Sequence, residues 1–380
     1  MSLPLSESTL PHEEERTSHH KPGADIRRPE IETGMISESI PVVETRSRKK
    51  YTRLITVTVR IGCTLALLAY AFAHNSWAGI LQNLRRVDDG ELLIGWVVGL
   101  FGVVISSYQW QSLLEAEKMR FDLRRLINYY LIGITFNNFL PTGMGGDVVK
   151  AYYTGKESQN MAGAASAVMT SRIAGFIGML LIAFPTLLIW HTLFPDTFIS
   201  SFVFAGLAMC CALITVIFVA NLLPRHVKGR WAEQSLVRSI LNISHTLHKG
   251  VKRPRSMCTA IAYGMLFHTS AALNYYSFAL MFNIHIPFAF FLVAIPFVSL
   301  IAVLPISING YGLREETFVH VLSIMHISPS TALAMALVFD AQMLVFALIG
   351  ACIYFSMGKS KATRPTHLSA EGQQDQPNYQ

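Results

Sequence analysis

The stretch "FNNFLPTGMGGDVVKAYYTGK", residues 136–156, interrupts an otherwise apolar part of the chain. An apolar run from Leu126 ends there in two amides, a proline and three glycines, and a charged, helix-compatible stretch begins at Asp147. Proline and glycine disfavour a continuous helix, so the pattern predicts a broken one. The run Leu126 to Leu140 gives about 22 Å of helix, less than the roughly 30 Å of a bilayer core. We therefore expect this segment to enter the membrane and return to the same side.

The composition around this break is that of a membrane protein. Of the 380 residues, 52% are hydrophobic and 14% are charged, against roughly 25% charged in an average soluble domain. A membrane-spanning helix needs about 20 mostly apolar residues. Six windows satisfy this: Leu54 to Ala73, Leu92 to Leu114, Ala162 to Trp190, Phe198 to Ala220, Met257 to Phe282 and Thr331 to Met357.

The distribution of positive charge predicts the orientation. Lys and Arg gather before the first window, after the second, between the fourth and fifth, and after the last. The positive-inside rule then places both termini in the cytoplasm and explains the net charge of +7 without a nucleic-acid partner. Residues 1–50 and 358–380 are polar and are expected to be disordered cytoplasmic tails around one transmembrane domain, residues 51–357. The five cysteines fall in apolar segments, which indicates small buried residues rather than disulfides.

A second break, "VLPISINGYGLREETF" at residues 303–318, repeats the pattern of the first at an offset of 164. In both, a glycine follows the proline by five residues and a cation follows it by nine. The same offset maps the second and third windows of the first half onto windows of the second half. The two halves are then about 54–190 and 198–357. Because each half would contain three full spans, an odd number, the second half would enter the membrane from the opposite side. We therefore predict an all-α polytopic fold of six transmembrane helices and two re-entrant hairpins arranged as an inverted-topology repeat, although a chance coincidence of residues remains open.

The two breaks are the candidate substrate site. A helix that restarts after a glycine turn has free N–H groups and a positive dipole end, which suit an anion such as a lipid phosphate. The amides at membrane depth either tie the backbone together or face a ligand, and Asp147 and Glu315 either serve locally, as a cap and as a partner of Arg314, or hold the cations or take a proton. The candidate residues are Asn137, Asn138, Pro141, Gly143, Gly145, Gly146, Asp147, Lys150, Asn309, Gly310, Gly312, Arg314 and Glu315.

Three charges lie inside the predicted spans. Arg60 is near a cytoplasmic end, where its side chain can reach the interface. Arg172 and Asp340 lie deeper on the third span of each half, and an unpaired charge there costs at least about 2.5–3.5 kcal/mol. We therefore predict that Arg172 and Asp340 form an intramembrane ion pair. His268 and Asn274 are expected to make helix–helix hydrogen bonds.

The sequence lacks the common motifs of cofactor chemistry. The glycines after Pro141 fit neither the dinucleotide nor the phosphate-loop pattern, and no metal-ligand spacing or nucleophile elbow is present. We predict no catalytic residue, no metal and no cofactor.

The two broken stretches, "NNFLPTGMGGDVVKAYY" and "LPISINGYGLREETF", resemble the motifs of the flippase-like transmembrane domain of lysylphosphatidylglycerol synthases and their stand-alone relatives. The resemblance covers about residues 50–357 and lacks the soluble aminoacyltransferase domain. It departs at Lys150, where the family usually has arginine, at Asn309-Gly310, where a Gly-Gly is usual, and at Ser171, where an acid often precedes the arginine. It implies translocation of a lipid between leaflets of the cell (inner or cytoplasmic) membrane by a multi-pass protein.

The resemblance leaves the cargo open: a phospholipid, a polyprenyl-linked sugar or a hopanoid-type lipid. A lipid-modifying enzyme is a possible partner, and no oligomeric state is predicted. Two alternatives to a translocator remain. One is a membrane enzyme or enzyme subunit that transfers a sugar or aminoacyl group onto a lipid carrier, with Asp147 or Glu315 as base, and the other is a scaffold that only binds lipid.

Overall fold

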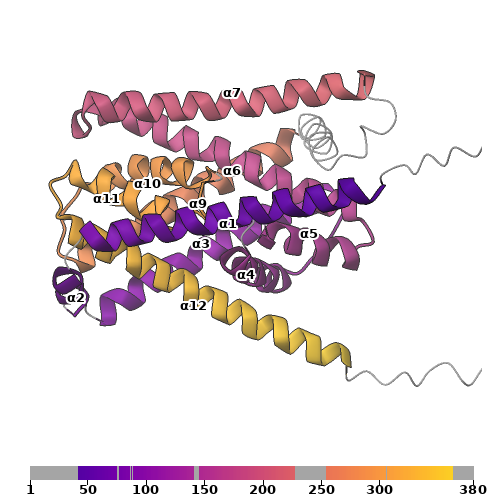
Figure 1. Ribbon diagram of the computed structural model, residues 1–380, viewed down its shortest axis with the longest axis horizontal. Coiled ribbons are helices and arrows are strands. Elements are labelled where there is room, and N and C mark those ends of the chain that lie inside the picture. The colour runs from indigo at the N-terminus through magenta and orange to yellow at the C-terminus, as the bar shows by residue number, and fades with distance from the viewer. Residues whose placement is uncertain are drawn as a thin grey trace, which may run out of the picture. The chain divides into compact units, whose positions relative to one another are not determined.

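The computed structural model describes residues 42–74, 77–85, 87, 89–140, 145–226, 254–304 and 306–362. The chain divides into two units, Met1–Lys50 and Tyr51–Gln380, and the architecture below is that of the second. The described regular structure is helical: α1 (Val42–His74), α2 (Trp77–Arg85), α3 (Asp89–Ala116), α4 (Leu123–Phe139), α5 (Gly145–Glu157), α6 (Met161–Ile189), the 3₁₀ turn η1 (His191–Leu193), α7 (Asp196–His226), α9 (Pro254–Met281), α10 (Phe288–Ala302), α11 (Leu313–Ser323) and α12 (Pro329–Ala362). Figure 1 shows α7 and α12 at opposite edges of this bundle.

The helix ends differ in small ways from those expected. Helix α1 begins at Val42 and α12 ends at Ala362, so both extend into segments predicted as tails, and the rest of those tails lies outside the described residues. The basic segment predicted between the fourth and fifth spans also falls largely outside them, at residues 227–253. Helix α2 lies in a predicted loop, where the short "WAGILQNLR" was too brief to stand out as a helix.

Five helices are long and apolar enough to cross a membrane: Ile55–Ala73, Gly90–Ala116, Met161–Ile189, Asp196–Thr215 and Pro329–Met357. They match five of the six predicted windows. The sixth window, Met257 to Phe282, falls on the 28-residue α9, which is not among the five. Helix α9 carries His268, Asn274 and three tyrosines, so it is less apolar than its neighbours. Its role as a sixth span remains a prediction.

Large apolar side chains remain exposed on these helices. Leu188, Phe204 and Phe355 keep 75%, 75% and 67% of their surface accessible. A soluble monomer rarely leaves many such side chains in contact with water. The exposed surface therefore fits contact with lipid, and with the five long apolar helices it describes a multi-pass membrane protein.

The helices of the two halves correspond at the offset found in the sequence. Adding 164 to the ends of α3, 89 and 116, gives 253 and 280, and α9 runs from 254 to 281. The same addition carries α4 from 123–139 to 287–303, where α10 occupies 288–302. Helices α5 and α6 correspond likewise to α11 and α12, with ends that differ by up to nine residues. The helix ends of the two halves thus follow the same offset as the two motifs.

Equivalent helices of the two halves run in opposite directions. Helices α3 and α9 pack together, and their contacts join the start of one to the end of the other. Gly95 faces the Phe278 ring, whereas Gln109 Nε2 donates to the Ala260 carbonyl at 2.8 Å. This antiparallel pairing of equivalent helices is the arrangement that an inverted repeat requires.

Helices α4 and α5 form the first hairpin. At its base, Arg125 forms an ion pair with Glu157, and the Tyr129 hydroxyl donates to the same carboxylate at 2.8 Å. Further along, Gly146 lies directly against the Gly133 carbonyl, so close that a Cβ on Gly146 would clash with it. Small residues allow such close approach of two helices in a membrane. Helix α4 ends at Phe139, the described chain continues to Leu140, and it resumes at Gly145, the first residue of α5.

Helices α10 and α11 form the second hairpin, joined by a loop over residues 303–312. Gly310 and Gly312 have φ of +78° and +80°, which side chains other than glycine rarely adopt. The loop is held by α1, because the Ile308 N–H donates to Thr64 Oγ1 at 2.9 Å. Most of α10 is buried, including Phe290 and Phe291 at 0% exposure. A 15-residue helix packed in this way does not need to span a bilayer.

Each hairpin is braced by the last long helix of the opposite half, α4 by α12 and α10 by α6. On α4, Thr135 Oγ1 donates to the Ala347 carbonyl of α12 at 2.6 Å. Gly350 of α12 lies against the Leu131 carbonyl, where a Cβ would clash. The offset relates α4 to α10 and α12 to α6, so the two packed pairs correspond to each other. Because each pair joins helices of different halves, the two halves interlock.

Candidate functional site

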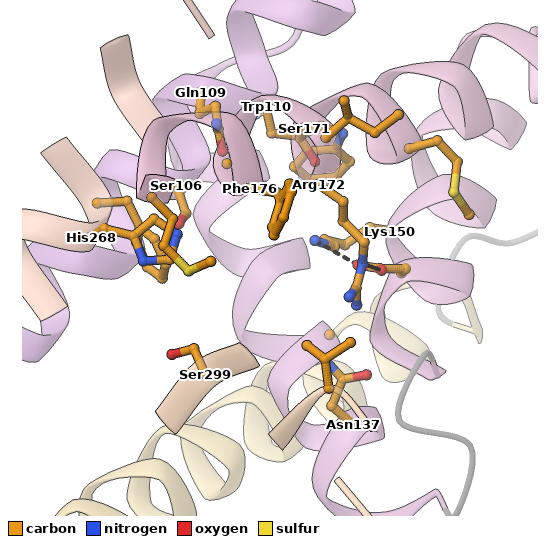
Figure 2. Close-up of a pocket in the computed structure, with 18 of the residues that line it drawn as sticks. Ser106, Gln109, Trp110, Asn137, Lys150, Ser171, Arg172, Phe176, His268 and Ser299 are labelled. Atoms are coloured by element: carbon orange, nitrogen blue, oxygen red, sulfur yellow. Dashed lines mark hydrogen bonds and ion pairs between the residues drawn. The ribbon is translucent and has the colours of Figure 1, made fainter. Parts of the chain in front are cut away.

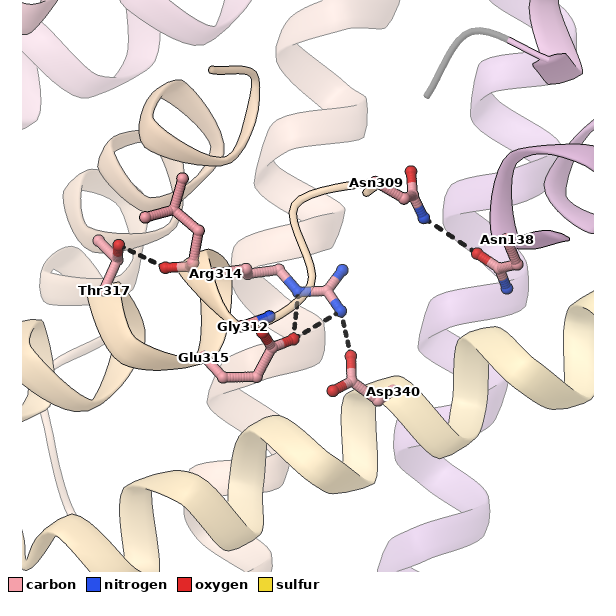
Figure 3. Close-up of polar contacts among 8 residues, drawn as sticks. Asn138, Asn309, Gly312, Arg314, Glu315, Thr317 and Asp340 are labelled. Carbon is pink, nitrogen blue, oxygen red and sulfur yellow. Dashed lines mark hydrogen bonds and ion pairs between the residues drawn. The ribbon is translucent and has the colours of Figure 1, made fainter. Parts of the chain in front are cut away.

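The tips of the two hairpins meet. Asn309 Nδ2 donates a hydrogen bond of 3.1 Å to Asn138 Oδ1, joining residues 171 positions apart in the chain (Figure 3). Asn138 Nδ2 donates in turn to the Met343 carbonyl of α12 at 3.3 Å. Asn309 has φ of +51°, a conformation that asparagine tolerates better than most residues. Asn138 therefore ties three segments of the chain together.

The neighbouring amide closes the first break. Asn137 Oδ1 accepts a hydrogen bond of 2.7 Å from the N–H of Gly146, at the start of α5. This bond satisfies one of the helix N–H groups that the break leaves free. The contacts of these amides describe tying of the broken backbone, and Asn137 in addition lines the cavity described below.

The first hairpin carries a cluster of two cations around one carboxylate. Asp147, in the first turn of α5, binds Lys150 Nζ through Oδ1 at 3.0 Å. Its other oxygen binds Nε of Arg172 on α6. The three side chains have a formal charge of +1. Asp147 is therefore the shared counter-ion of both cations and does not simply charge a helix end.

Aromatic rings fix Lys150 further. Its ammonium lies over the ring of Tyr130 at 4.8 Å and that of Trp110 at 5.7 Å from the centroids. Cation–π contacts of this kind are attractive, most of all where water is excluded. The Lys150 side chain is only 12% exposed, whereas that of Arg172 is 44% exposed. Arg172 is thus the cation of this cluster that has room to meet a ligand.

The second hairpin carries the opposite arrangement, one cation between two carboxylates (Figure 3). Arg314 donates to Glu315 Oε1 through Nε at 3.2 Å and Nη2 at 3.0 Å. Its Nη2 also binds Asp340 on α12. Glu315 accepts in addition from the Gly312 N–H, which places it as a cap of α11. The formal charge of these three side chains is −1, and Glu315 is 1% exposed.

The predicted ion pair between Arg172 and Asp340 is wrong. Arg172 pairs with Asp147 and Asp340 pairs with Arg314, so each deep charge is neutralised by the hairpin of its own half. The reason for expecting pairing, the cost of an isolated charge in a membrane, still applies. The charges are paired within each half rather than between the halves.

A cavity of about 660 Å³ opens beside the first hairpin. Figure 2 shows Lys150 and Arg172 on one side of it, Ser106 and His268 on the other, and Phe176 between. Its volume is in the usual range for small-ligand sites, about 300–1,000 Å³. The residues that line it are Ser106, Gln109, Trp110, Tyr130, Gly133, Ile134, Asn137, Asp147, Lys150, Met169, Ser171, Arg172, Ile173, Gly175, Phe176, Met179, Met209, Ala212, Leu213, Phe267, His268, Ser299, Leu300 and Val303.

The structure separates the predicted site residues into two groups. Asn137, Asp147 and Lys150 line the cavity. The other described candidates do not line it and shape or join the hairpins instead: Gly145, Gly146, Asn138, Asn309, Gly310, Gly312, Arg314 and Glu315. Pro141 and Gly143 lie outside the described residues.

Several cavity residues escaped the sequence-based prediction. Trp110 and Ser106 lie on α3, in a window that was interpreted only as a span. The polar run Ser106 to Ser112 was a usable signal, because it places several hydrogen-bonding side chains within an apolar helix. His268, expected to make a helix–helix hydrogen bond, lines the cavity as well as contacting the backbone of Gly175.

Metal chemistry has no candidate in the described part of the chain. No group of three or more His, Cys, Asp or Glu side chains there is placed to hold a metal ion. The nearest to such a group, Glu315 with Asp340, is bridged by a guanidinium.

These features define a class: a polytopic helical membrane protein with two helical hairpins that meet at their tips beside a charged cavity. The comparison with protein families agrees. Residues 55–351 match the family described as the lysylphosphatidylglycerol synthase TM region, and the chain belongs to that family.

A curated relative fits the same class. The chain is 30% identical over 130 residues to a UPF0104 membrane protein of Pyrococcus horikoshii. The matched region covers 33% of this chain and 35% of the relative, so the similarity spans about a third of that protein's length. The family and the relative's name together support a membrane protein, as the helices do.

Proposed function

We propose that this protein moves a lipid with a phosphate-containing headgroup between the leaflets of the cell membrane. Two hairpins enter the bilayer from opposite faces in this proposal, and the headgroup occupies the cavity beside the first. Both termini lie in the cytoplasm, as the basic segments indicate. A lipid-modifying enzyme that supplies or consumes the cargo is the expected partner.

The observation that carries the proposal is the contact between hairpin tips. Helix α3 ends, and α4 and α6 begin, on the side rich in Lys and Arg, and the base of the first hairpin lies there with Arg125. In this proposal the second half is inverted, so the base of the other hairpin lies on the opposite side. The Asn138–Asn309 bond then joins the tips between the two faces. Broken helices that meet near the midplane are the usual setting of substrate sites in secondary transporters.

The charge of the cavity supports an anionic cargo. Its described lining holds Lys150, Arg172 and one carboxylate, Asp147. Arg172 binds Asp147 through Nε, and its terminal nitrogens have no partner among the described residues, so they can form a fork toward a phosphate. A headgroup with one negative charge would neutralise the formal charge of +1, and it would do so where unbalanced charge is costly.

The enzyme alternative has less support from the same contacts. A general base needs a carboxylate that can reach a substrate proton. Both oxygens of Asp147 are bound by cations. Glu315 is occupied by Arg314 and the Gly312 N–H and lies away from the cavity. Neither candidate base is therefore placed for group transfer.

Reconstitution tests the proposal. The purified chain is placed in vesicles that contain a fluorescent phosphatidylglycerol, and leaflet exchange is followed by quenching of the outer leaflet. We expect exchange above that of protein-free vesicles and at least a tenfold loss with Arg172→Gln, the magnitude of one charge-assisted hydrogen bond.

Arg125→Gln is the matched control, because it removes the same charge from the exposed base of the hairpin. Exchange at the protein-free rate, or equal loss in both variants, contradicts the proposal. A donor-dependent lipid product without exchange favours the enzyme alternative.

A further inference from the structure

One wall of the cavity holds two polar groups that have no hydrogen-bond partner among the described residues. The Trp110 indole Nε1–H is buried without a hydrogen-bond partner, and Trp110 is 1% exposed. Ser106 is 6% exposed, and its hydroxyl has no partner in the described part of the chain. Buried polar groups are almost always hydrogen-bonded, so the orphaned indole N–H of Trp110 needs an explanation.

Both groups can donate a hydrogen bond into the cavity. Ser106 and Trp110 are four residues apart on α3, so they lie on one face of the helix. Both line the cavity (Figure 2). An indole N–H only donates, and a serine hydroxyl can donate. The Trp110 N–H therefore lacks an acceptor oxygen, which a ligand would bring, and the Ser106 hydroxyl can donate to the same ligand.

An ammonium group on the ligand would find no free carboxylate among the described lining residues. Among the described residues that line the cavity, Asp147 is the one carboxylate, and both of its oxygens are held by Lys150 and Arg172. The rings of Trp110 and Tyr130, which could attract an ammonium group, already face Lys150. A cationic headgroup would also meet a cluster with a formal charge of +1.

We propose that the α3 wall is a subsite for the uncharged, oxygen-bearing part of a phosphate-ester headgroup, such as glycerol or a sugar. The phosphate meets Arg172, the adjoining hydroxyls or ether oxygens accept from Trp110 and Ser106, and headgroups that carry an amine are disfavoured. This inference rests on the proposed function, because it assumes that the cavity receives the headgroup.

Binding to the purified full chain in detergent tests the subsite separately from transport. The probes are phosphatidylglycerol and phosphatidylethanolamine with the same fluorescent acyl chain, and the readout is the dissociation constant by fluorescence anisotropy. We expect phosphatidylglycerol to bind about tenfold more tightly. Trp110→Phe should weaken its binding about tenfold, and Ser106→Ala about threefold, as loss of one donor each implies.

Trp96→Phe is the matched control. Its indole Nε1 is also buried without a partner on α3, but Trp96 does not line the cavity. We expect this variant to bind phosphatidylglycerol like the unaltered protein. Thermal unfolding of each variant identifies any that fail to fold. If Trp110→Phe fails to fold, Ser106→Ala still tests the subsite.

The outcomes separate the two proposals. If phosphatidylglycerol binds and exchanges but Trp110→Phe and Ser106→Ala bind it like Trp96→Phe, the subsite is wrong and the proposed function stands. Equal or tighter binding of phosphatidylethanolamine also overturns the subsite. If phosphatidylglycerol neither binds nor exchanges, both proposals fail.

Discussion

The two hairpins share an architecture and differ in the sign of their charge. In the first, the carboxylate of Asp147 stands between two cations. In the second, the guanidinium of Arg314 stands between two carboxylates. In each, one partner comes from the long helix that follows the hairpin, Arg172 on α6 or Asp340 on α12. In both halves an ion pair thus links the hairpin to the long helix that follows it, and the charges of the two partners are reversed.

Exposure separates the roles of the two clusters. The side chains of Arg314, Asp340 and Glu315 are 17%, 18% and 1% exposed, whereas that of Arg172 is 44% exposed and borders the cavity. The second cluster is closed and holds its hairpin in place. The first leaves one cation available. In the proposed function, the equivalent elements of the two halves would therefore have different tasks, one for the ligand and one for structure.

The largest expected effect comes from removing the central group of either cluster. Asp147→Asn leaves two cations without a counter-ion, and Arg314→Met leaves two carboxylates. Losing one partner of a buried pair costs about 3–5 kcal/mol of the free energy of unfolding. Thermal and denaturant unfolding of the purified protein in micelles measure this loss.

The outer members of the clusters provide the control. Arg172→Met and Asp340→Asn each leave a balanced pair, so each should cost less than the central substitution of its own hairpin. If an outer substitution destabilises the protein as much as the central one, the contacts do not describe how charge is balanced. The comparison between the hairpins would then lose its basis.

The next effect tests the close approach of helices within the first hairpin. A Cβ on Gly146 would overlap the Gly133 carbonyl, a backbone atom that cannot turn aside. Gly146→Ala should therefore destabilise the protein by about 1–3 kcal/mol, the usual cost of overpacking. Gly62→Ala on α1 is the control, since nothing lies within 4 Å of its Cβ position. Equal unfolding temperatures for the two variants would show that α4 and α5 are not in such close contact.

The position of the hairpins was accessible from sequence because glycine and proline act locally. The spacing after Pro141 placed the restart of a helix at Asp147, and α5 begins at Gly145. The offset of 164 aligned the second break, and α10 and α11 flank it. Helix periodicity and turn chemistry carry this information within a few residues of chain.

The partners of the charges were not accessible in the same way. Arg172 at offset 164 corresponds to position 336, one turn from Asp340, so both were known to lie deep on equivalent helices. Which carboxylate Arg172 meets depends on the rotation of α6 against α5, and packing alone decides that. Trp110 was missed for a related reason: its importance lies in a missing partner, and only the assembled structure can show that.

The smallest expected effect concerns the bond that joins the two hairpins. Asn138 and Asn309 are each replaced by leucine, singly and together, and unfolding free energies give their coupling. Hydrogen bonds between helices in membranes average about 0.6 kcal/mol in such cycles, so we expect a coupling near that value. Asn138 also donates to Met343, hence Asn138→Leu should cost more than Asn309→Leu. A coupling of zero would mean that the tips touch without stabilising each other, and the Asn138–Asn309 contact would then not hold the hairpins together.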